Sequence, residues 1–293
     1  MSQAEDLRKR RMQRNFARAA ADYESSAMLS AEVLQRMLER LDLMQLAPRR
    51  VLDLGSGTGI AARALEQRYH PEQLIGLDLS LPMLRRHSDR RSWRRAWRSE
   101  RATRICADFE QLPVRSGELD LVISNLALHW SAQPARVFAE VSRVLRVGGL
   151  FMFTTFGPDT LKELAQAAAE PSGVSPVHAF TDMHDLGDAL VASGLSDPVM
   201  EMEYLTLTYE RLDGLLHDLK HSGGMSTRAT CAGLRTPRWR ERIAQRYERW
   251  RRDTRLPATF ELVYGHAWKA QRRNTQTEDG RAVIQFEPRR RKM

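Results

Sequence analysis

Three acidic side chains stand at the ends of three separate apolar runs, at Asp53 in "RVLDLG", Asp78 in "LIGLDL" and Asp108 in "ATRICAD". The first run leads into "GSGTG", a turn that is rich in glycine. Glycine adds no Cβ and accepts positive φ angles, so a ligand can lie directly against such a turn. Carboxylates accept hydrogen bonds from hydroxyl, amino and ammonium groups. This pattern predicts the binding of one polar ligand that carries several donors.

The spacing of the glycines excludes two common nucleotide sites. The dinucleotide fingerprint G-x-G-x-x-G places its third small residue where this chain has Ile60. A phosphate-binding P-loop ends in Gly-Lys-Ser/Thr, and no such ending follows Gly59. The turn is therefore expected to bind a ligand of another kind.

The three aspartates match the parts of one such ligand in order. Asp53 can face an ammonium group, through water or backbone, while the turn wraps the neighbouring carboxylate. Asp78 can accept hydrogen bonds from both hydroxyls of a ribose. Asp108 can accept from an adenine amino group while the Phe109 ring packs against the base. An amino acid, a ribose and an adenine in a row describe S-adenosylmethionine. In the alternative interpretation, the aspartates only cap the turns after their strands.

These side chains need strands that end at one edge of a sheet. Apolar runs predict strands at residues 50–55, 74–79, 102–108, 119–128 and 149–156. Helices are expected at 60–69, 82–90 and 135–149, with Gly148 and Gly149 ending the last one. Two further strands, at 198–209 and 261–270, close the sheet. The pattern predicts an α/β fold with a doubly wound, seven-stranded, mostly parallel, Rossmann-like sheet, which binds ligands at the carboxyl ends of its strands.

Helical segments are expected to surround this sheet. Apolar residues at helical spacing from Ala27 to Leu41 predict an amphipathic helix ahead of the first strand, and residues 1–46 are assigned to an N-terminal helical lid. Residues 47–270 form the α/β domain, with helical insertions near 157–195 and 210–252. The second insertion is strongly basic and is expected to cap the sheet. The basic tail, residues 271–293, is polar and is predicted to be disordered.

The bulk composition limits the class of protein. The chain has 293 residues and a net charge of +9, which favours acidic partners. Cys106 and Cys231 are its only cysteines and lie far apart, which fits a reducing cytoplasm better than a disulfide framework. No signal peptide and no apolar run long enough to span a membrane is found, so no membrane association is expected.

The glycine turn, the acidic strand ends and "LDLVISNLALHW" together resemble the successive motifs of class I S-adenosylmethionine-dependent methyltransferases. More specific strings, above all "TTFGPDTL" and "DMHDLGDAL", are similar to the malonyl-acyl-carrier-protein O-methyltransferases of biotin synthesis. This second resemblance extends from about residue 13 to residue 269. The chain departs from the family pattern at "VHAF" and "HSGGMST", where the family has an Asn-Arg-Phe-like segment and a Gly-Ala and Asn segment. These departures bear on substrate contacts more than on the cofactor site.

The resemblance implies transfer of a methyl group from S-adenosylmethionine to the free carboxylate of a malonyl thioester on acyl carrier protein. The methyl ester disguises that carboxylate, so fatty-acid synthesis enzymes will elongate the chain. A carboxylate is already an anion at neutral pH, so the reaction needs alignment and exclusion of water rather than a general base, and no catalytic residue is assigned. The cofactor-binding residues expected are Asp53, Gly55, Ser56, Gly57, Asp78, Leu79, Met83, Asp108, Phe109 and Asn125.

Three residues are candidates for substrate contact, each with a structural alternative. By resemblance, the hydroxyl of Tyr23 on the lid donates to the substrate carboxylate; otherwise its ring only anchors the helix. His129, after the fourth strand, hydrogen-bonds the substrate or is a surface or capping histidine. Phe180 lines the pocket or belongs to the core.

Arg91, Arg94, Arg95 and Arg98 share one face of a helical pattern in an arginine-rich segment. Three interpretations compete: a solvated helix face, a docking site for the acidic carrier protein, and contact with nucleic acid, which is the least favoured. Docking of the acidic carrier protein is the candidate function of this face.

Two further alternatives concern chemistry. The cluster His178, Asp182, His184 and Asp185 has the residue types of a metal site, but Asp182 is better explained as a helix cap, and no metal is expected. The rival functions are methylation of another small carboxylic acid or a quinone precursor, and a non-catalytic accessory protein that binds S-adenosylmethionine or RNA. The choice between carrier protein and coenzyme A, the acyl chain length and the oligomeric state stay open.

Overall fold

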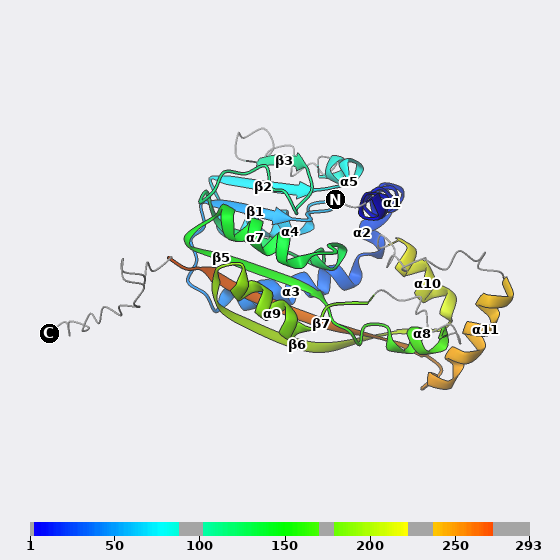
Figure 1. The fold of residues 1–293 in the computed structure, drawn as a ribbon. Helices are drawn as coiled ribbons and strands as arrows, with labels where there is room; N and C mark the ends of the chain where they lie inside the picture. Colours follow the sequence, from blue (N-terminus) through cyan, green and yellow to red (C-terminus); the bar gives the residue numbers. More distant parts are fainter. Residues whose placement is uncertain (1–2, 88–101, 170–178, 222–236, 272–293) are drawn as a thin grey trace.

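The computed structural model describes residues 3–87, 102–169, 179–221 and 237–271, and Figure 1 shows their arrangement. One seven-stranded sheet has the order β3-β2-β1-β4-β5-β7-β6. Its strands are β1 (Arg50–Leu54), β2 (Gln73–Asp78), β3 (Ala102–Cys106), β4 (Leu119–Ser124), β5 (Leu145–Phe156), β6 (Leu195–Tyr209) and β7 (Leu256–Lys269). Strands β1 to β5 pair in parallel, and β7 pairs antiparallel with both β5 and β6. The predicted fold class is confirmed.

Alternating side chains of the inner strands build a core on each face of the sheet. In β1, Val51 packs in one core with α3 (Met28–Asp42) and α4 (Ile60–Tyr69), whereas Leu52 packs in the other with α7 (Pro134–Val144) and α9 (Met183–Ala192). Figure 1 shows α7 and α9 together on one side of the sheet. The layers are therefore helix, sheet and helix, as expected of a doubly wound fold.

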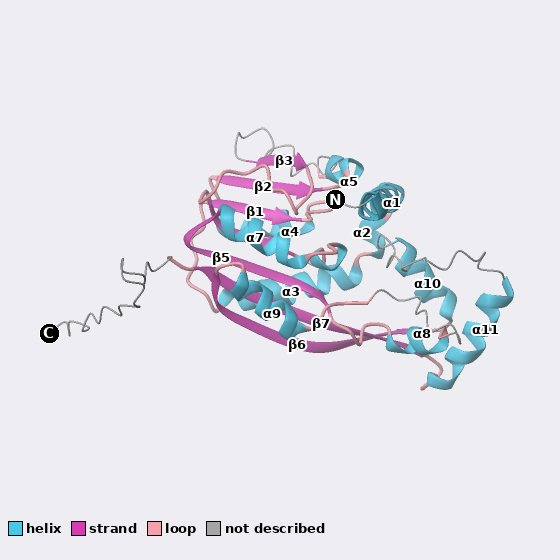
Figure 2. Ribbon diagram, in the orientation of Figure 1, coloured by secondary structure: helices cyan, strands magenta, loops and turns pink. Residues whose placement is uncertain are grey.

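The remaining helices gather around the carboxyl ends of the parallel strands (Figure 2). They are α1 (Gln3–Ala19), α2 (Tyr23–Ser26), α5 (Leu81–Arg86), η1 (Leu128–Trp130), α8 (Lys162–Ala167), α10 (Leu212–His221), α11 (Pro237–Tyr247) and η2 (Glu248–Trp250). Helices α8 and α9 fall within the expected insertion near 157–195. Helices α10 and α11 fall within the insertion near 210–252.

The segment assigned to the lid, residues 1–46, divides into two structurally different parts. Helices α1 and α2 lie across the strand ends, whereas α3 buries Val33, Met37 and Leu41 completely in the core beside β5. The apolar spacing that predicted α3 thus reflects a layer of the domain itself. Of the predicted lid, only α1 and α2 lie where they can cover a ligand.

One predicted helix boundary is wrong. Helix α7 ends at Val144, and Gly148 and Gly149 lie inside strand β5. A Cβ on Gly149 would come within 3.0 Å of the Leu119 carbonyl oxygen, so this glycine allows β5 to approach β4 closely.

In the part of the chain that the structure describes, no helix is both long enough and apolar enough to cross a bilayer. Residues 272–293, most of the predicted tail, lie outside the described residues.

Candidate functional site

The glycine turn between β1 and α4 has the conformation that its sequence predicts. Gly55 and Gly57 have φ angles of 76° and 54°, in the region that side chains disfavour. The backbone N–H groups of Gly55 and Ser56 both donate to the Leu77 carbonyl, at 2.8 and 2.9 Å, which ties the turn to β2. A Cβ at Gly55 would lie 2.4 Å from the Ala127 Cβ, so no larger residue fits there without movement.

A buried histidine that the sequence analysis missed supports this turn from below. His87 follows α5, is fully buried, and places its Nε2 3.0 Å from the Gly57 carbonyl oxygen. A Cβ at Gly59 would lie 2.7 Å from the Nδ1 of the same ring. Burial lowers the pKa of His87 to about 4, so the ring is neutral at physiological pH and Nε2–H can donate to Gly57. Nothing in the sequence around "RRHSD" distinguishes this residue from a surface histidine.

Asp53 is buried beneath the turn rather than exposed on it. It accepts a hydrogen bond from the Ala62 backbone N–H. Its Oδ2 atom is buried and has no hydrogen-bond partner among the described residues. Burial raises the pKa of Asp53 to about 7, and the nearby Asp78 carboxylate adds to the effect. A carboxylate in this position favours a positively charged neighbour.

Asp78 joins the glycine turn to the loop after β2. Its Oδ2 accepts from the Gly57 N–H at 2.9 Å, and its Oδ1 accepts from the Ser80 N–H at 2.7 Å. Burial raises the pKa of this carboxyl, and the two backbone hydrogen bonds oppose that effect. Each oxygen keeps a further lone pair, so the carboxylate can still receive two ligand hydroxyls.

Asp108, which follows β3, forms an ion pair with helix α1 of the lid. The Lys9 ammonium of α1 lies 2.6 Å from Asp108 Oδ2 and 2.6 Å from Glu110 Oε2. Asp108 Oδ1 accepts from the Glu110 N–H at 2.9 Å. An adenine amino group would therefore share this carboxylate with Lys9, a residue that sequence reasoning did not single out.

Three other predicted cofactor residues lie at or after the ends of β2 and β3. Met83 is fully buried, and its Cε lies 3.7 Å from the place that a Cβ of Gly57 would take. The Leu79 carbonyl accepts from the Gln13 amide of α1 at 3.1 Å. Phe109 is partly buried and packs against the core beside α7. Helix α1 thus contacts the predicted cofactor residues Leu79 and Asp108, and Met83 lies against the glycine turn.

Asn125, also predicted to bind the cofactor, connects β4 to its neighbours. Its Nδ2 donates to the Ser30 carbonyl at 2.9 Å, and its Oδ1 accepts from the Thr154 hydroxyl at 2.9 Å. The following residue, Leu126, has a φ of 47°, which is costly for a residue with a branched side chain. Asn125 therefore holds the start of α3 against the strand ends, and its direct contact with a cofactor stays a prediction.

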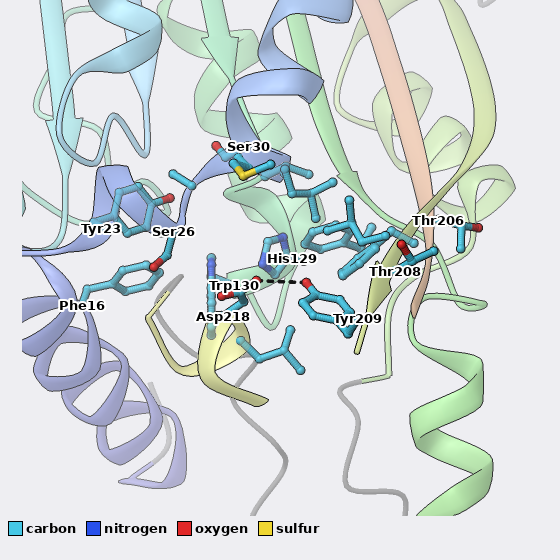
Figure 3. A pocket seen from close by; sticks show the side chains of 18 of the residues that line it. Phe16, Tyr23, Ser26, Ser30, His129, Trp130, Thr206, Thr208, Tyr209 and Asp218 are labelled. Carbon is cyan, nitrogen blue, oxygen red and sulfur yellow. Dashed lines mark hydrogen bonds between the residues drawn. The ribbon is translucent and has the colours of Figure 1, made fainter. Parts of the chain in front are cut away.

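A cavity of about 550 Å³, here called the main cavity, lies beside the glycine turn (Figure 3). Figure 3 shows Tyr23 and Phe16 at one end, His129 in the middle, and Thr206 and Thr208 at the other end. The lining is Phe16, Tyr23, Ser26, Ala27, Met28, Leu29, Ser30, Leu126, His129, Trp130, Phe156, Thr206, Leu207, Thr208, Tyr209, Asp218, Leu219, Arg255 and Phe260. Its lining extends from the helices α1 and α2 to the edge strand β6.

Tyr23 connects the main cavity to the cofactor side. Its Cε1 lies 4.0 Å from the position of a Cβ on Gly57, and its hydroxyl shares a hydrogen bond with the Ser30 side chain. Burial and the negative charge of Asp78 raise the pKa of Tyr23 to about 12. The phenol therefore stays protonated and available as a donor at neutral pH.

His129 and Phe180 occupy different positions relative to the main cavity. The His129 ring lines it and packs against Trp130 and Phe156, with ring centres 5.0 and 4.9 Å away. Phe180 lies behind His129, at 5.8 Å between ring centres, and lines a separate cavity of about 130 Å³. Of these two predicted substrate residues, only His129 borders the main cavity.

The "FGPDT" segment, which carried much of the resemblance, forms a turn after β5 that is held by buried glutamates. Glu261 Oε2 accepts from the Asp159 N–H at 2.6 Å, and a Cβ on Gly157 would lie 2.3 Å from its Cδ. Glu163, also buried, accepts from the Thr259 hydroxyl at 2.5 Å. The sequence analysis did not single out this contact, although a glutamate inside the apolar run "ATFELVYG" is a signal of a buried polar contact. The segment anchors β5 to β7 at the floor of the main cavity.

Two other predictions concern residues away from this cavity. Asp182 caps α9, because its side chain accepts from the His184 N–H at 2.8 Å, as the cap interpretation requires. Arg91, Arg94, Arg95 and Arg98 lie outside the described residues, as does His178.

Comparison with known proteins places this site in a class and then in a family. Residues 52–153, which contain the glycine turn and the strand ends, match the methyltransferase domain family. The YcgJ protein of Bacillus subtilis shares the fold, with a TM-score of 0.57 at 17% identity, over 82% of this chain and 99% of that one. The fold and the glycine turn thus define a Rossmann-like methyltransferase.

Sequence similarity extends over nearly the whole chain. The malonyl-[acyl-carrier protein] O-methyltransferase of Laribacter hongkongensis is 48% identical over 98% of this chain and 99% of its own. That of Methylovorus sp. is 45% identical, over 96% of this chain and 95% of its own. The chain belongs to the malonyl-[acyl-carrier protein] O-methyltransferase family.

Proposed function

We propose that the chain transfers the methyl group of S-adenosylmethionine to the free carboxylate of a malonyl thioester carried by acyl carrier protein. The product is the malonyl methyl ester that starts pimeloyl synthesis for biotin. The observation that carries the proposal is the main cavity, which extends from Tyr23, beside the glycine turn, to the edge strand β6. The names of the relatives support the substrate. Two cysteines without disulfide spacing support a cytoplasmic reaction.

The charges around the glycine turn fit this cofactor. Asp53 and Asp78 are two carboxylates whose ionised forms are destabilised by burial, and Asp53 keeps an oxygen without a partner among the described residues. A ligand with an ammonium and a sulfonium group brings compensating positive charge. A structural neighbour, a phosphoethanolamine N-methyltransferase of Haemonchus contortus with a TM-score of 0.50, is described in complex with S-adenosylhomocysteine. That likeness concerns the fold, and it supports the assignment only alongside the charges.

The residues that would hold the cofactor are those of the turn and the three strand ends. Asp78 would receive the ribose hydroxyls, and Asp108, with Phe109, would face the adenine. Met83 and Leu79 form apolar and backbone parts of the wall, and α1 covers them through Gln13. When bound, the cofactor supplies an activated methyl group.

The side chains of the main cavity have the remaining tasks, which are orientation and exclusion of water. The Tyr23 phenol is a donor that can orient the malonyl carboxylate. Phe16, Trp130 and Phe156 supply apolar walls, with Phe16 and Trp130 in edge-to-face contact at 5.2 Å between ring centres. A dry pocket weakens the solvation that slows attack by an anion. No general base is required, because the malonyl carboxylate is already ionised at neutral pH.

The proposal is tested by incubating the purified protein with S-adenosylmethionine and malonyl-carrier protein and weighing the carrier. The expected product is heavier than malonyl-carrier protein by one methylation. Cleavage of the thioester should return the carrier to its unacylated mass, which places the added methyl group on the acyl chain rather than on the protein. Acetyl-carrier protein, which has no free carboxylate, is the control and should not change. An unmodified malonyl-carrier protein, with methylation of another small carboxylic acid, would establish the rival function.

A further inference from the structure

A second cavity meets the main cavity at the edge strand β6. This edge cavity has a volume of about 580 Å³ and is lined by Lys162, Glu163, Gln166, Thr206, Thr208, Trp250, Arg252, Asp253, Arg255, Pro257 and Thr259. It shares three lining residues with the main cavity, namely Thr206, Thr208 and Arg255. Arg255 therefore stands where a ligand in the main cavity reaches the surface of the protein.

A two-residue turn presents Arg252 and Arg255 side by side. Their backbones exchange hydrogen bonds of 2.9 and 2.8 Å across Asp253 and Thr254. Both central residues have positive φ, 43° and 68°, although Thr254 is β-branched and adopts that region at a cost. A hairpin turn with glycine would avoid this strain. Such strain persists where the surrounding structure enforces it, and it is common at ligand sites.

Arg251 enforces the turn. Its guanidinium donates to the Thr254 carbonyl at 2.5 Å and to the Glu210 carbonyl at 3.1 Å, and it pairs with Glu248. Arg251 thus stabilises the turn through its own side chain, whereas Arg252 and Arg255 line the edge cavity.

The guanidinium of Arg255 is held in one orientation and is weakly neutralised. Its Nε and Nη2 donate to the hydroxyl and carbonyl of Thr208, at 2.9 and 2.8 Å. Its Nη1 lies 3.7 Å from a carboxylate oxygen of Glu210, whose side chain is 84% exposed. Such an exposed pair contributes little, so an anion of better geometry can replace Glu210.

Asp218 fixes the direction in which a thioester can lie. It lines the main cavity, accepts from the Tyr209 hydroxyl at 3.1 Å, and in Figure 3 lies between the Tyr23 end and the Thr206 end. Its negative charge repels a carboxylate but accepts hydrogen bonds from amide N–H groups. The malonyl carboxylate therefore belongs at the Tyr23 end, and the amide-bearing arm passes Asp218 towards Arg255.

We propose that Arg255, with Arg252, binds the phosphate of the phosphopantetheine arm that carries the malonyl group. This assignment rests on the proposed function and adds to it the site at which the arm is recognised. Arginine suits the task because its planar donors match phosphate oxygens in pairs. The site recognises the phosphopantetheine arm rather than the protein surface of the carrier. Malonyl-coenzyme A has a phosphate at the same position of its arm and is therefore expected to bind Arg255 as well.

The test compares two small thioesters, malonyl-pantetheine and malonyl-4′-phosphopantetheine, which differ by one phosphate. For the wild-type protein, the phosphorylated thioester should have a KM about tenfold lower, the equivalent of one charge-assisted hydrogen bond. Arg255→Gln should abolish this difference by raising the KM of malonyl-4′-phosphopantetheine to that of malonyl-pantetheine, and an unchanged affinity for S-adenosylmethionine, measured by calorimetry, shows that the variant is folded. Arg252→Gln should reduce the difference, and Arg255→Lys should restore part of it.

Arg242→Gln is the matched control, because Arg242 is an exposed residue of α11 that lines neither cavity. It should keep the full difference between the two thioesters. Equal KM values for the two thioesters with the wild-type protein, or an equal rise for both in Arg255→Gln, would overturn the phosphate site. Failure of the wild-type protein to methylate any malonyl thioester would instead overturn the proposed function.

Discussion

The Lys9 ammonium lies 2.6 Å from the Asp108 carboxylate and joins the first helix of the chain to the end of β3. Two more side chains of α1 form hydrogen bonds with backbone carbonyls: Gln13 donates to Leu79, and Arg8 donates to Trp130. The helix thus spans the ends of β2, β3 and β4 by polar contacts. In the proposed site, α1 therefore covers the side of the cofactor that faces Leu79 and Asp108.

Lys9→Gln is expected to loosen this helix. The change removes a half-buried charge paired with Asp108 and Glu110, which we expect to weaken docking by about 1–3 kcal/mol. Faster proteolysis within α1 and a severalfold faster release of S-adenosylhomocysteine should result, the latter measured by stopped-flow fluorescence. Arg14→Gln, on the exposed side of the same helix, is the control. If the two variants behave alike, the Lys9 contacts do not hold the lid.

Tyr23→Phe separates the hydroxyl from the ring. The variant keeps the ring that packs near Gly57 but loses the donor, so cofactor affinity should stay and kcat with malonyl-carrier protein should fall by about tenfold or more. Steady-state kinetics and calorimetry measure the two quantities. Tyr204 lies on β6, and its exposed hydroxyl donates to Asp159. Tyr204→Phe removes that hydroxyl and should leave both cofactor affinity and kcat unchanged. Normal turnover in Tyr23→Phe would mean that Tyr23 only packs.

Asp53→Asn should stabilise the ligand-free protein at the expense of cofactor binding. The folded pKa of Asp53 is raised from 3.8 to about 7, so the native state holds a proton that the unfolded chain has released between these values. Wild-type stability therefore falls as pH rises through this window, and the neutral variant avoids that loss. At pH 8 the variant should exceed wild type by about 2–4 kcal/mol, with a smaller gap at pH 4.5. Denaturant titrations at the two pH values, with and without S-adenosylmethionine, measure it.

His87→Gln should show the opposite dependence on pH. The folded pKa of His87 is lowered from 6.5 to about 4, so the unfolded chain binds a proton first as the solution is acidified. Wild-type stability contributed by this site is complete above pH 6.5 and is lost as pH falls towards 4. The variant can still donate to the Gly57 carbonyl but does not titrate. Its stability relative to wild type should rise steadily from pH 7 to pH 4, and a constant difference would refute the assignment.

The predicted cofactor residues rest on local signals. The glycine turn needs positive φ at Gly55 and Gly57, and Asp53 and Asp78 stand in the last two residues of β1 and β2. Each of these features belongs to one short stretch of the sequence, so the sequence shows it directly. The strands and most helices followed from apolar spacing for the same reason. The end of α7 was misplaced because Gly149 serves the close approach of β5 to β4, and not a helix cap.

Contacts between distant segments left no such signal. Lys9 is one basic residue among several in α1, and only the folded chain places it against Asp108. Asp218 belongs to the polar helix α10, and Arg255 belongs to a basic turn. The composition of both segments is typical of an exposed protein surface. Their role depends on the cavity that β6 and α10 form with α2, which no local pattern predicts.

The contacts of α1 also bear on how the protein is made. Gln13 meets its partner 66 residues later in the chain, and Arg8 meets its partner 122 residues later. During synthesis the helix leaves the ribosome long before either carbonyl exists, and its polar sequence provides little reason to collapse early. Helix α1 is therefore expected to dock late, after the parallel strands that carry its partners have assembled. Hydrogen exchange on the nascent and the finished chain should find α1 protected only in the latter.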